Sequence, residues 1–427
     1  MSRETGATEV ARTGTAAIVH RTTCRVCDAA NLEPILSFGR MPLANAFLGS
    51  PEEFAAEQSY PLDLYFCPGC SLLQLLDVVD PDVLFRHYLY VTGTSTTQAE
   101  HNRAYARTLV ERLRLGPGDL VAEVASNDGS LLRSFAPHGV RTLGVEPARN
   151  LAAEATAAGV ETVNEFFTCA LARRLRADRG PARAVVASNV LAHVDDPRDF
   201  LAGCRALVAD DGLVTLEMSY VGDLVERVEY DIVYHEHLSY FSIASLLRLG
   251  EAVNLSAVRI DRFPVHGGSL RVYLSPSAQG HASEVRALEA LERRAGLMEV
   301  ERYRRFANEV RESRDALVGL LERLTGEGRR VAGYGAAAKG NTLLNFCGID
   351  TRLLCYVADR NPRKIGLYTP GTHIPVRDVS TLSSGAETPD YLLILAWNLA
   401  DEVMLQQRTY HDRGGRFIIP VPRAKVI

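Results

Sequence analysis

The stretch VAEVASNDG, Val121–Gly129, decides the fold expected for the middle of this chain. Its first half is typical of a buried strand, and its last three residues are typical of a tight turn that opens a helix. Glu146 lies at the end of the next apolar segment, Arg141–Val145. In nucleotide-binding α/β folds, a carboxylate at this position accepts hydrogen bonds from the ribose hydroxyls. We therefore expect a nucleotide-like ligand at this edge of a parallel sheet.

The ligand predicted from this layout is S-adenosylmethionine. NAD is the alternative, because NAD folds use a ribose-binding carboxylate in the same way. The turn lacks a complete Gly-x-Gly-x-x-Gly motif, which lowers the case for a dinucleotide. The residues predicted to contact the cofactor are Glu123, Asn127, Asp128, Gly129, Glu146 and Asn189.

Short apolar segments alternate with helical ones around this turn, which predicts an α/β fold with a parallel sheet. The segment 80–115 is expected to be helical. The predicted strands are Leu120–Val124, Arg141–Val145, Ala184–Ser188 and Gly212–Glu217. Two further segments, Ala257–Ile260 and Ser269–Leu274, suit an antiparallel pair that closes the edge of the sheet.

A second α/β unit is expected near the C-terminus. The stretch GYGAAAKG, residues 333–340, resembles a glycine-rich turn between a strand and a helix. Such a turn lets a phosphate approach the backbone, and Lys339 would add a positive charge. Before it, residues 282–325 are charged and lack proline, so we expect one or two helices that link the domains. The strands predicted for this unit are Arg329–Tyr334, Leu353–Ala358, Tyr391–Ala396 and Arg416–Pro420.

Four of the eight cysteines form two Cys-x-x-Cys pairs. Four thiolates at this spacing predict one tetrahedral zinc ion that is structural, because no open position remains for water. A redox dithiol is the alternative, but two matched pairs in one short segment count against it. The predicted ligands are Cys24, Cys27, Cys67 and Cys70.

Composition limits the function classes. The chain has 427 residues, 47% of them hydrophobic, and a formal net charge of −5. This length predicts two or three domains, and the charge gives no argument for a nucleic acid or an anionic membrane as partner. No stretch is apolar enough to span a bilayer, and the first 20 residues lack the apolar segment of a signal peptide. We expect a disordered tail there and a cytoplasmic protein.

The peptide Tyr234-His235-Glu236-His237 brings together side chains that transfer protons. A polar surface loop is the simplest alternative. A His-Glu-His metal site is another, although three adjacent residues rarely converge on one ion. An imidazole with a pKa near neutrality suits a general base, so the cluster favours group transfer that needs a base.

The order of these motifs resembles that in the sugar C-methyltransferases of antibiotic deoxysugar pathways. The resemblance runs from Thr22 to about Pro420, and it rests on the two cysteine pairs, Glu123–Gly129, Asn189–Pro197, Tyr234–His237 and Gly333–Asn345. One departure is Thr92-Gly93, where the family often has two serines. The domains that the resemblance implies are a zinc module at 21–75 after a tail at 1–20, a methyltransferase domain at 76–281, a helical linker at 282–325 and a Rossmann-like domain at 326–427.

The resemblance also implies the chemistry. The substrate would be a dTDP-linked 4-keto deoxysugar, methylated at a carbon next to the ketone. Separately from the resemblance, we expect a monomer. His237 would be the base, Glu236 and Tyr234 would bind or orient the sugar, and His193 and Tyr90 would face the same cavity. The C-terminal residues expected to bind the nucleotide sugar are Tyr334, Lys339, Asn341 and Arg360.

Three other functions use parts of the same pattern. An O- or N-methyltransferase acting on a sugar or small natural product would share the fold but would not need a base for a carbon acid. An NAD-dependent nucleotide-sugar enzyme would use two nucleotide folds. A zinc-containing scaffold without activity would not need the cluster Tyr234–His237.

Overall fold

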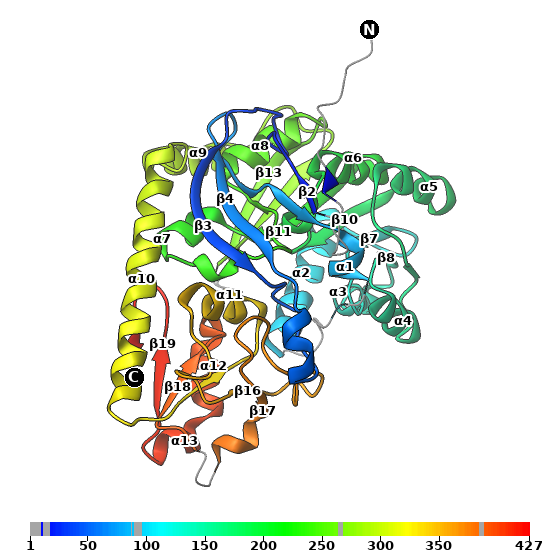
Figure 1. Cartoon of the computed structure of the whole chain (residues 1–427). Helices are drawn as coiled ribbons and strands as arrows, with labels where there is room; N and C mark the ends of the chain where they lie inside the picture. The colour runs from blue at the N-terminus through cyan, green and yellow to red at the C-terminus, as the bar shows by residue number, and fades with distance from the viewer. Residues whose placement is uncertain (1–9, 12–17, 87, 89–95, 264–267, 384–387) are drawn as a thin grey trace.

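The computed structural model describes residues 10–11, 18–86, 88, 96–263, 268–383 and 388–427. The chain forms an N-terminal module, a central α/β domain and a C-terminal α/β domain (Figure 1). This arrangement confirms the predicted fold class.

The N-terminal module is built from short antiparallel strands. One sheet has the order β1-β2-β6, and the other has the order β12-β5-β4-β3. Ile18–His20, which were expected to belong to a disordered tail, form β2 and pair with β6. The elements are β1 (Val10–Ala11), β2 (Ile18–His20), β3 (Glu33–Met41), η1 (Pro51–Ala56), β4 (Tyr60–Cys67), β5 (Leu72–Leu75) and β6 (Asp77–Val79).

The two cysteine pairs meet in this module. The Sγ atoms of the four cysteines all lie within 4.8 Å of one another. A tetrahedral zinc with bonds of about 2.3 Å needs sulfur separations of about 3.8 Å. Gly69 keeps the second knuckle close to the first, because a Cβ there would come within 3.3 Å of the Sγ of Cys27. The donor set and its spacing therefore fit one zinc ion.

The central domain is a seven-stranded sheet with the order β13-β14-β11-β10-β7-β8-β9. Its strands are parallel except for β14, which is antiparallel to both of its neighbours. The predicted antiparallel pair at the edge is thus confirmed. The strands are β7 (Leu120–Val124), β8 (Arg141–Val145), β9 (Thr162–Val163), β10 (Ala182–Ser188), β11 (Val208–Ser219), β13 (Ser256–Phe263) and β14 (Ser269–Ser275).

The helices of this part cover both faces of the sheet (Figure 1). The expected helical segment at 80–115 is two helices, because α1 ends at Phe85 and α2 begins at Thr96. The elements are α1 (Pro81–Phe85), α2 (Thr96–Leu113), α3 (Ser130–Arg133), η3 (Ala136–His138), α4 (Arg149–Ala157), α5 (Cys169–Arg179), η4 (Leu191–His193), α6 (Pro197–Leu207), α7 (Val221–Glu226), η5 (Tyr230–Ile232) and α8 (Ile243–Glu251).

The C-terminal domain is a six-stranded sheet with the order β17-β16-β15-β18-β19-β20, in which only β20 is antiparallel. This order reverses direction at β15, as in doubly wound nucleotide-binding folds. The predicted strand at Leu353–Ala358 starts later, at Val357, and β17 was not predicted. The strands are β15 (Val331–Tyr334), β16 (Val357–Asp359), β17 (Val376–Asp378), β18 (Tyr391–Ile394), β19 (Arg416–Ile419) and β20 (Lys425–Val426).

Two helices precede this sheet, and the longer one, α10, runs along one side of the molecule (Figure 1). Its buried residues recur every three or four positions, for example Tyr303, Phe306 and Val310. They belong to a hydrophobic core shared with β3 and with α11. The elements are α9 (Ser283–Arg294), α10 (Val300–Gly326), α11 (Ala338–Cys347), η7 (Val379–Leu382), η8 (Trp397–Leu399), α12 (Ala400–Gln406) and α13 (Arg408–Asp412).

One strand from the central part of the chain joins the sheet of the N-terminal module. β12 (Ser239–Tyr240) pairs antiparallel with β5, in the register Ser239 to Gln74 and Tyr240 to Leu73. The peptide Tyr234–His237 lies just before β12, so the zinc module holds the end of this loop.

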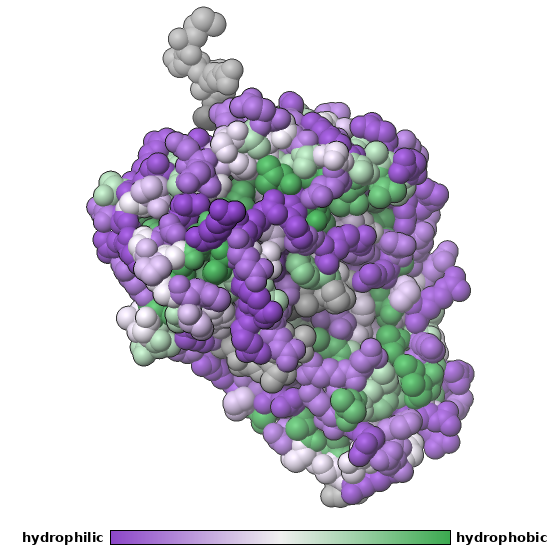
Figure 2. Space-filling model, turned by 180° about the vertical axis from the view of Figure 1, so that it is seen from behind, coloured by the Kyte–Doolittle hydropathy of each residue, from purple (hydrophilic) through white to green (hydrophobic). Residues whose placement is uncertain are grey.

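On the outside, hydrophilic residues cover most of the face seen in Figure 2. Among the described helices, none combines the length and the apolar character that crossing a bilayer requires.

We expect the purified protein to carry about one zinc ion per chain, because the four sulfur atoms match one tetrahedral site. Cys67→Ser should remove the zinc and lower the melting temperature, since metal binding to such a small module contributes directly to its folding. Elemental analysis and thermal unfolding measure these effects. Cys355→Ser is the matched control, because Cys355 contacts the carbonyl of Val331 at 3.1 Å and serine can keep that bond. Active protein without zinc would contradict the assignment.

Candidate active site

The predicted cofactor residues lie at the carboxyl end of the central sheet. Glu123 lies in β7, Glu146 follows β8, and Asn189 follows β10. β7 and β10 are neighbours at the point where the strand order reverses. Ligands of open α/β sheets bind outside the carboxyl ends of the strands at such a point.

The turn after β7 has the backbone that its sequence predicts. Asn127 and Gly129 have positive φ angles of 51° and 73°. A Cβ on Gly129 would approach the Cγ2 of Val160 to 2.9 Å, so this position favours glycine both for its φ angle and for its packing. Asp128 accepts from the backbone N–H of Ser130 at 3.2 Å and lies 3.5 Å from the guanidinium of Arg133. The turn therefore leads directly into α3.

Glu146 is fixed at this edge by two backbone donors. Its Oε2 accepts from the N–H of Asn127 and its Oε1 from the N–H of Ala148, both at 2.8 Å. Burial raises the pKa of Glu146, and the two N–H donors oppose that rise. Each oxygen of an ionised carboxylate has about two acceptor positions, so both oxygens retain one for a ribose hydroxyl.

Glu123 has a buried acceptor that lacks a donor. Its side chain is 5% exposed, and its Oε2 has no hydrogen-bond partner within the part of the chain that the structure describes. Burial, with the neighbouring carboxylates of Asp128 and Glu146, raises the pKa of Glu123 well above its usual value. Such an orphaned group needs a donor, which a bound ligand can supply. Asn189 is exposed at the same edge with a φ of 54°, and its N–H donates to the carbonyl of Glu217 at 2.7 Å.

Tyr234 and His237 form a hydrogen-bonded pair. The Tyr234 hydroxyl lies 2.9 Å from Nε2 of His237, and Nδ1 of His237 lies 2.8 Å from the carbonyl oxygen of Ile232. A carbonyl only accepts, so Nδ1 carries the proton and Nε2 presents its lone pair. Burial lowers the pKa of His237 to about 4, with the positive charge of Lys339 adding to this effect. The imidazole is therefore neutral near pH 7 and available as a base.

His193 lies next to this pair. Its ring centroid is 4.8 Å from that of His237, and the side chain of Phe85 packs on it at 5.5 Å. Burial lowers the pKa of His193 well below its usual value. The carbonyl of Ala192 accepts from the N–H of Leu238 at 2.7 Å, which joins the backbones of the two segments. Two neutral imidazoles therefore face one another.

Glu236 is buried between side chains from different parts of the chain. Its Oε1 accepts from Nδ2 of Asn45 at 2.6 Å, and its Oε2 accepts from the hydroxyl of Tyr88 at 2.8 Å. Burial raises the pKa of Glu236, while these two donors and the charge of Lys364 lower it. Asn45 belongs to the N-terminal module, so this module contributes directly to the cluster.

His235 faces away from this cluster. Its Nε2 contacts the carbonyls of Tyr60 at 3.3 Å and Pro61 at 3.2 Å. It thus anchors the loop to β4 of the N-terminal module. In the described chain, the ligand atoms of the four cysteines lie close enough together to share a metal ion. Those of His235, Glu236 and His237 do not, so the alternative of a His-Glu-His metal site is not supported. Tyr90, which was also predicted at this cavity, lies outside the described residues.

The predicted substrate residues lie around the carboxyl end of the C-terminal sheet. Tyr334 ends β15 and contacts Gln406 at 3.5 Å and Gln407 at 3.3 Å, while Arg360 follows β16 and is exposed. α11 packs closely on the end of β18, because a Cβ on Gly340 would come within 2.8 Å of the Cβ of Leu395.

Lys339 and Asn341, both on α11, point to the domain boundaries. Lys339 lies 3.8 Å from the carboxylate of Asp231 in the central domain. Asn341 donates to the carbonyl of Ala44 at 2.7 Å, while its buried Oδ1 has no hydrogen-bond partner in the described chain. Tyr234, Asn341 and Met41 border a gap where the three domains meet, and this gap is too small to hold a water molecule.

Comparison with known proteins identifies these parts. Family models match residues 24–85 as a zinc binding domain, 98–260 as a methyltransferase domain and 264–422 as a C-methyltransferase C-terminal domain. The chain is 38% identical over 406 residues to the C-methyltransferase NovU of Streptomyces niveus, a match that covers 95% of this chain and 96% of NovU. The chain belongs to the C-methyltransferase family.

Two solved methyltransferase structures resemble part of this C-methyltransferase. The magnesium protoporphyrin IX methyltransferase of Synechocystis, solved with S-adenosylmethionine, is 15% identical, with a TM-score of 0.32 over 41% of this chain and 78% of that chain. The 1,6-didemethyltoxoflavin-N1-methyltransferase of Burkholderia thailandensis is 19% identical, with a TM-score of 0.32 over 42% of this chain and 79% of that chain.

The C-methyltransferase uses S-adenosylmethionine and binds zinc, as the family models and the Cys24–Cys70 cluster indicate. The predicted roles of individual residues at the cofactor edge and at the Tyr234–His237 cluster stay predictions. Sequence reasoning missed Asn45, Lys364 and Asp231. Asn45 and Lys364 lie in unrelated segments, and only the folded chain brings them near Glu236. Asp231 carried a signal, since it is an acidic residue three positions before Tyr234.

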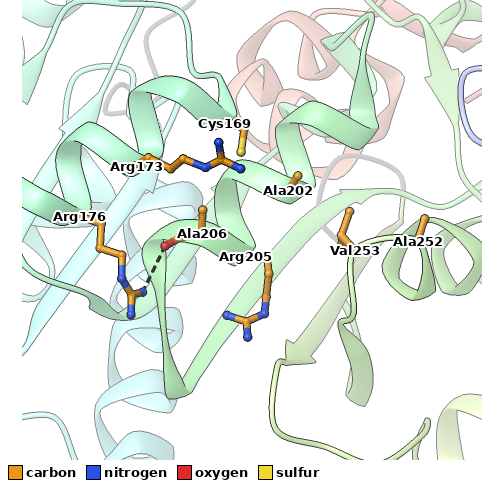
Figure 3. Close-up of a pocket in the computed structure, with 8 residues that line it drawn as sticks. All are labelled: Cys169, Arg173, Arg176, Ala202, Arg205, Ala206, Ala252 and Val253. Atoms are coloured by element: carbon orange, nitrogen blue, oxygen red, sulfur yellow. Dashed lines mark hydrogen bonds between the residues drawn. The ribbon is translucent and has the colours of Figure 1, made fainter. Parts of the chain in front are cut away.

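A surface cavity of about 360 Å³ lies elsewhere on this C-methyltransferase, between α5, α6 and the segment after α8 (Figure 3). It shares no residue with the Tyr234–His237 cluster. Arg176 in its wall donates to the carbonyl of Val208 at 2.7 Å, and Arg205 pairs with Asp210, so two of its guanidinium groups are engaged in structural contacts.

Glu146→Ala should weaken S-adenosylmethionine binding by removing a charged acceptor of ribose hydroxyls, a loss on the order of 1.5–3 kcal/mol. Isothermal titration calorimetry measures the affinity. Glu154→Ala is the control, because Glu154 lies on the following helix, α4, and pairs with Arg363 at a partly exposed site. Unchanged affinity in Glu146→Ala would mean that the ribose site lies elsewhere.

Proposed function

We propose that this enzyme methylates the carbon next to the ketone of a nucleotide-linked 4-keto deoxysugar in an antibiotic pathway, with dTDP as the nucleotide. The observation that carries the proposal is the Tyr234–His237 pair, in which the Ile232 carbonyl leaves Nε2 of a neutral imidazole as the acceptor. The pair lies near the boundary between the cofactor domain and a second nucleotide-type α/β domain.

A carbon next to a ketone becomes a nucleophile only after it loses a proton. In the proposed step, Nε2 of His237 takes that proton, and the C–H bonding electrons become the enolate. S-adenosylmethionine supplies the methyl group when bound. The enolate carbon then forms the new carbon–carbon bond, and the sulfonium leaves with the electrons of its methyl bond. The lowered pKa of His237 keeps its lone pair free at physiological pH, but it also makes this imidazole a weaker proton acceptor than the near-neutral one expected from the sequence.

Tyr234 and Glu236 are proposed to hold the sugar. The Tyr234 hydroxyl donates to Nε2 of His237. An incoming ketone oxygen would accept that O–H instead, which would leave Nε2 of His237 free to take a proton. A neutral donor at the developing oxyanion stabilises it without a change in net charge. Glu236 already accepts from Asn45 and Tyr88, and its remaining acceptor positions suit sugar hydroxyls.

The nucleotide end of the substrate is proposed to bind at the C-terminal sheet. The strand order reverses at β15, and Tyr334, Lys339, Asn341 and Arg360 surround the carboxyl ends of that region. Membership in a C-methyltransferase family favours carbon as the methyl acceptor over oxygen or nitrogen, and the methyltransferase-domain match favours S-adenosylmethionine over NAD.

His237→Asn should lower turnover roughly 10²–10⁴-fold, the usual contribution of a general base. Both ligands should still bind, because their nucleotide parts are held elsewhere. Mass spectrometry of a dTDP-4-keto sugar incubated with S-adenosylmethionine measures methylation. His138→Asn is the control, since His138 is exposed in the turn after α3. Methylation by His237→Asn at the wild-type rate would remove His237 as the base and make His193 the next residue to test.

The pH profile should reflect the buried imidazole. Burial lowers the pKa of His237 to about 4, so the base remains unprotonated as the pH falls through the usual histidine range. Hence kcat/KM should hold level between about pH 5.5 and 7.5 and should fall only as the pH approaches the lowered value. Initial rates in short assays, on protein shown to be folded at each pH, measure the profile. A limb centred near pH 6.5 would contradict this assignment.

A further inference from the structure

One short turn faces both the base and the C-terminal domain. In η5, Tyr230–Ile232, the carbonyl of Ile232 accepts from Nδ1 of His237 at 2.8 Å. The preceding residue, Asp231, directs its carboxylate to the other side, where Nε1 of Trp397 donates to Oδ2 at 2.6 Å. The ammonium of Lys339 lies 3.8 Å from the same oxygen. Consecutive residues thus contact the base on one side and the C-terminal domain on the other.

Trp397 and Lys339 reach this turn from two neighbouring strands. Lys339 lies in α11, which follows β15, and Trp397 follows β18, which pairs with β15. The ammonium of Lys339 lies 4.1 Å from the centre of the Trp397 ring, close enough for a cation–π contact. The ammonium also donates to Oδ1 of Asn398 at 3.4 Å, and a lysine ammonium has three N–H donors in all.

Because Asp231 is buried, loss of its contact with Lys339 or Trp397 would destabilise the folded protein. Asp231 is 0% exposed, and its Oδ1 has no hydrogen-bond partner in the described chain. The positive charge of Lys339 and the Trp397 N–H both favour the ionised carboxylate, against the effect of burial. Glu229, a second buried carboxylate, lies 3.9 Å from Arg227. Removing one partner of a buried charge pair leaves the other uncompensated, which is costly.

We propose that Asp231 is a positioning residue that holds Lys339 and Trp397 of the C-terminal domain against the turn that orients His237. Asp231 then fixes the place of Lys339, while the carbonyl of the next residue, Ile232, sets the tautomer of His237. The effect of Asp231 on turnover rests on the proposed function, whereas its effect on domain contact does not.

Fluorescence tests the contact without substrate, because Trp397 is the only tryptophan in the chain. Asp231→Ala should shift the emission and increase quenching by acrylamide, since the indole loses its N–H acceptor and its packed position. Asp231→Asn should change the emission less, because an amide oxygen still accepts from the indole. Asp401→Asn is the control, since Asp401 is exposed four residues from Trp397 and should leave emission unchanged. Wild-type emission and quenching in Asp231→Ala would overturn the proposed contact.

Kinetics separate positioning from simple stabilisation. In Asp231→Asn, kcat should fall on the order of 10²-fold and KM for the nucleotide sugar should rise, because a small displacement of catalytic groups has an effect of this size. S-adenosylmethionine affinity should remain that of the wild type. A residue that only stabilises the fold would lower the melting temperature and leave kcat and KM of the folded enzyme unchanged, and that result would overturn the proposal.

The pair Asp231–Lys339 gives a further test. If Asp231 acts through Lys339, the double variant Asp231→Asn/Lys339→Met should lose little more activity than Lys339→Met alone. Fully additive losses would overturn the positioning role. If fluorescence changes as expected while every dTDP-4-keto sugar stays unmethylated, the contact stands and the proposed function fails instead.

Discussion

The pairing of β12 with β5 is the constraint on which the active site depends. β12 begins two residues after His237, and β5 lies in the sheet of the zinc module. Arg25, between the first two cysteines, is 2% exposed and donates to the carbonyl of Leu75, with the carbonyl of Leu238 at 3.4 Å. Arg25 and the β12–β5 pairing therefore connect the cysteine cluster to the backbone beside His237.

Contacts between domains also account for the buried charges. Glu236 depends on Asn45, Asp231 depends on Trp397, and His235 contacts the carbonyls of Tyr60 and Pro61. Each of these groups would carry an unsatisfied polar atom if its partner segment moved away, and a buried unsatisfied group costs about 1–3 kcal/mol. Polar contacts of this kind therefore define one relative placement of the three parts, whereas apolar packing alone tolerates many.

The sequence predicted the local elements better than their contacts. The strands Leu120–Val124 and Arg141–Val145 match β7 and β8 residue for residue, because apolar segments bounded by turn residues carry their own signal. The four zinc ligands were predictable from spacing alone. The helix expected at 80–115 was wrong in extent, and β2 was taken for disordered tail, because a three-residue strand depends on its partner β6. Asn45 and Trp397 gave no local signal, since their partners lie 191 and 166 positions away in the chain.

The two α/β domains are proposed to bind ligands of different charge near the boundary between them. The cofactor edge carries the carboxylates Glu123 and Glu146, which suit the hydroxyls and the cationic parts of S-adenosylmethionine. The C-terminal edge presents Lys339, which suits an anionic diphosphate. Under the proposed function, the positive charge of Lys339 would favour the diphosphate at the C-terminal edge, and the buried carboxylates would disfavour it at the cofactor edge. His237 lies between them as a neutral group. Burial and the nearby ammonium of Lys339 both lower the pKa of His237, so the lysine proposed to bind the diphosphate also keeps the proposed base unprotonated.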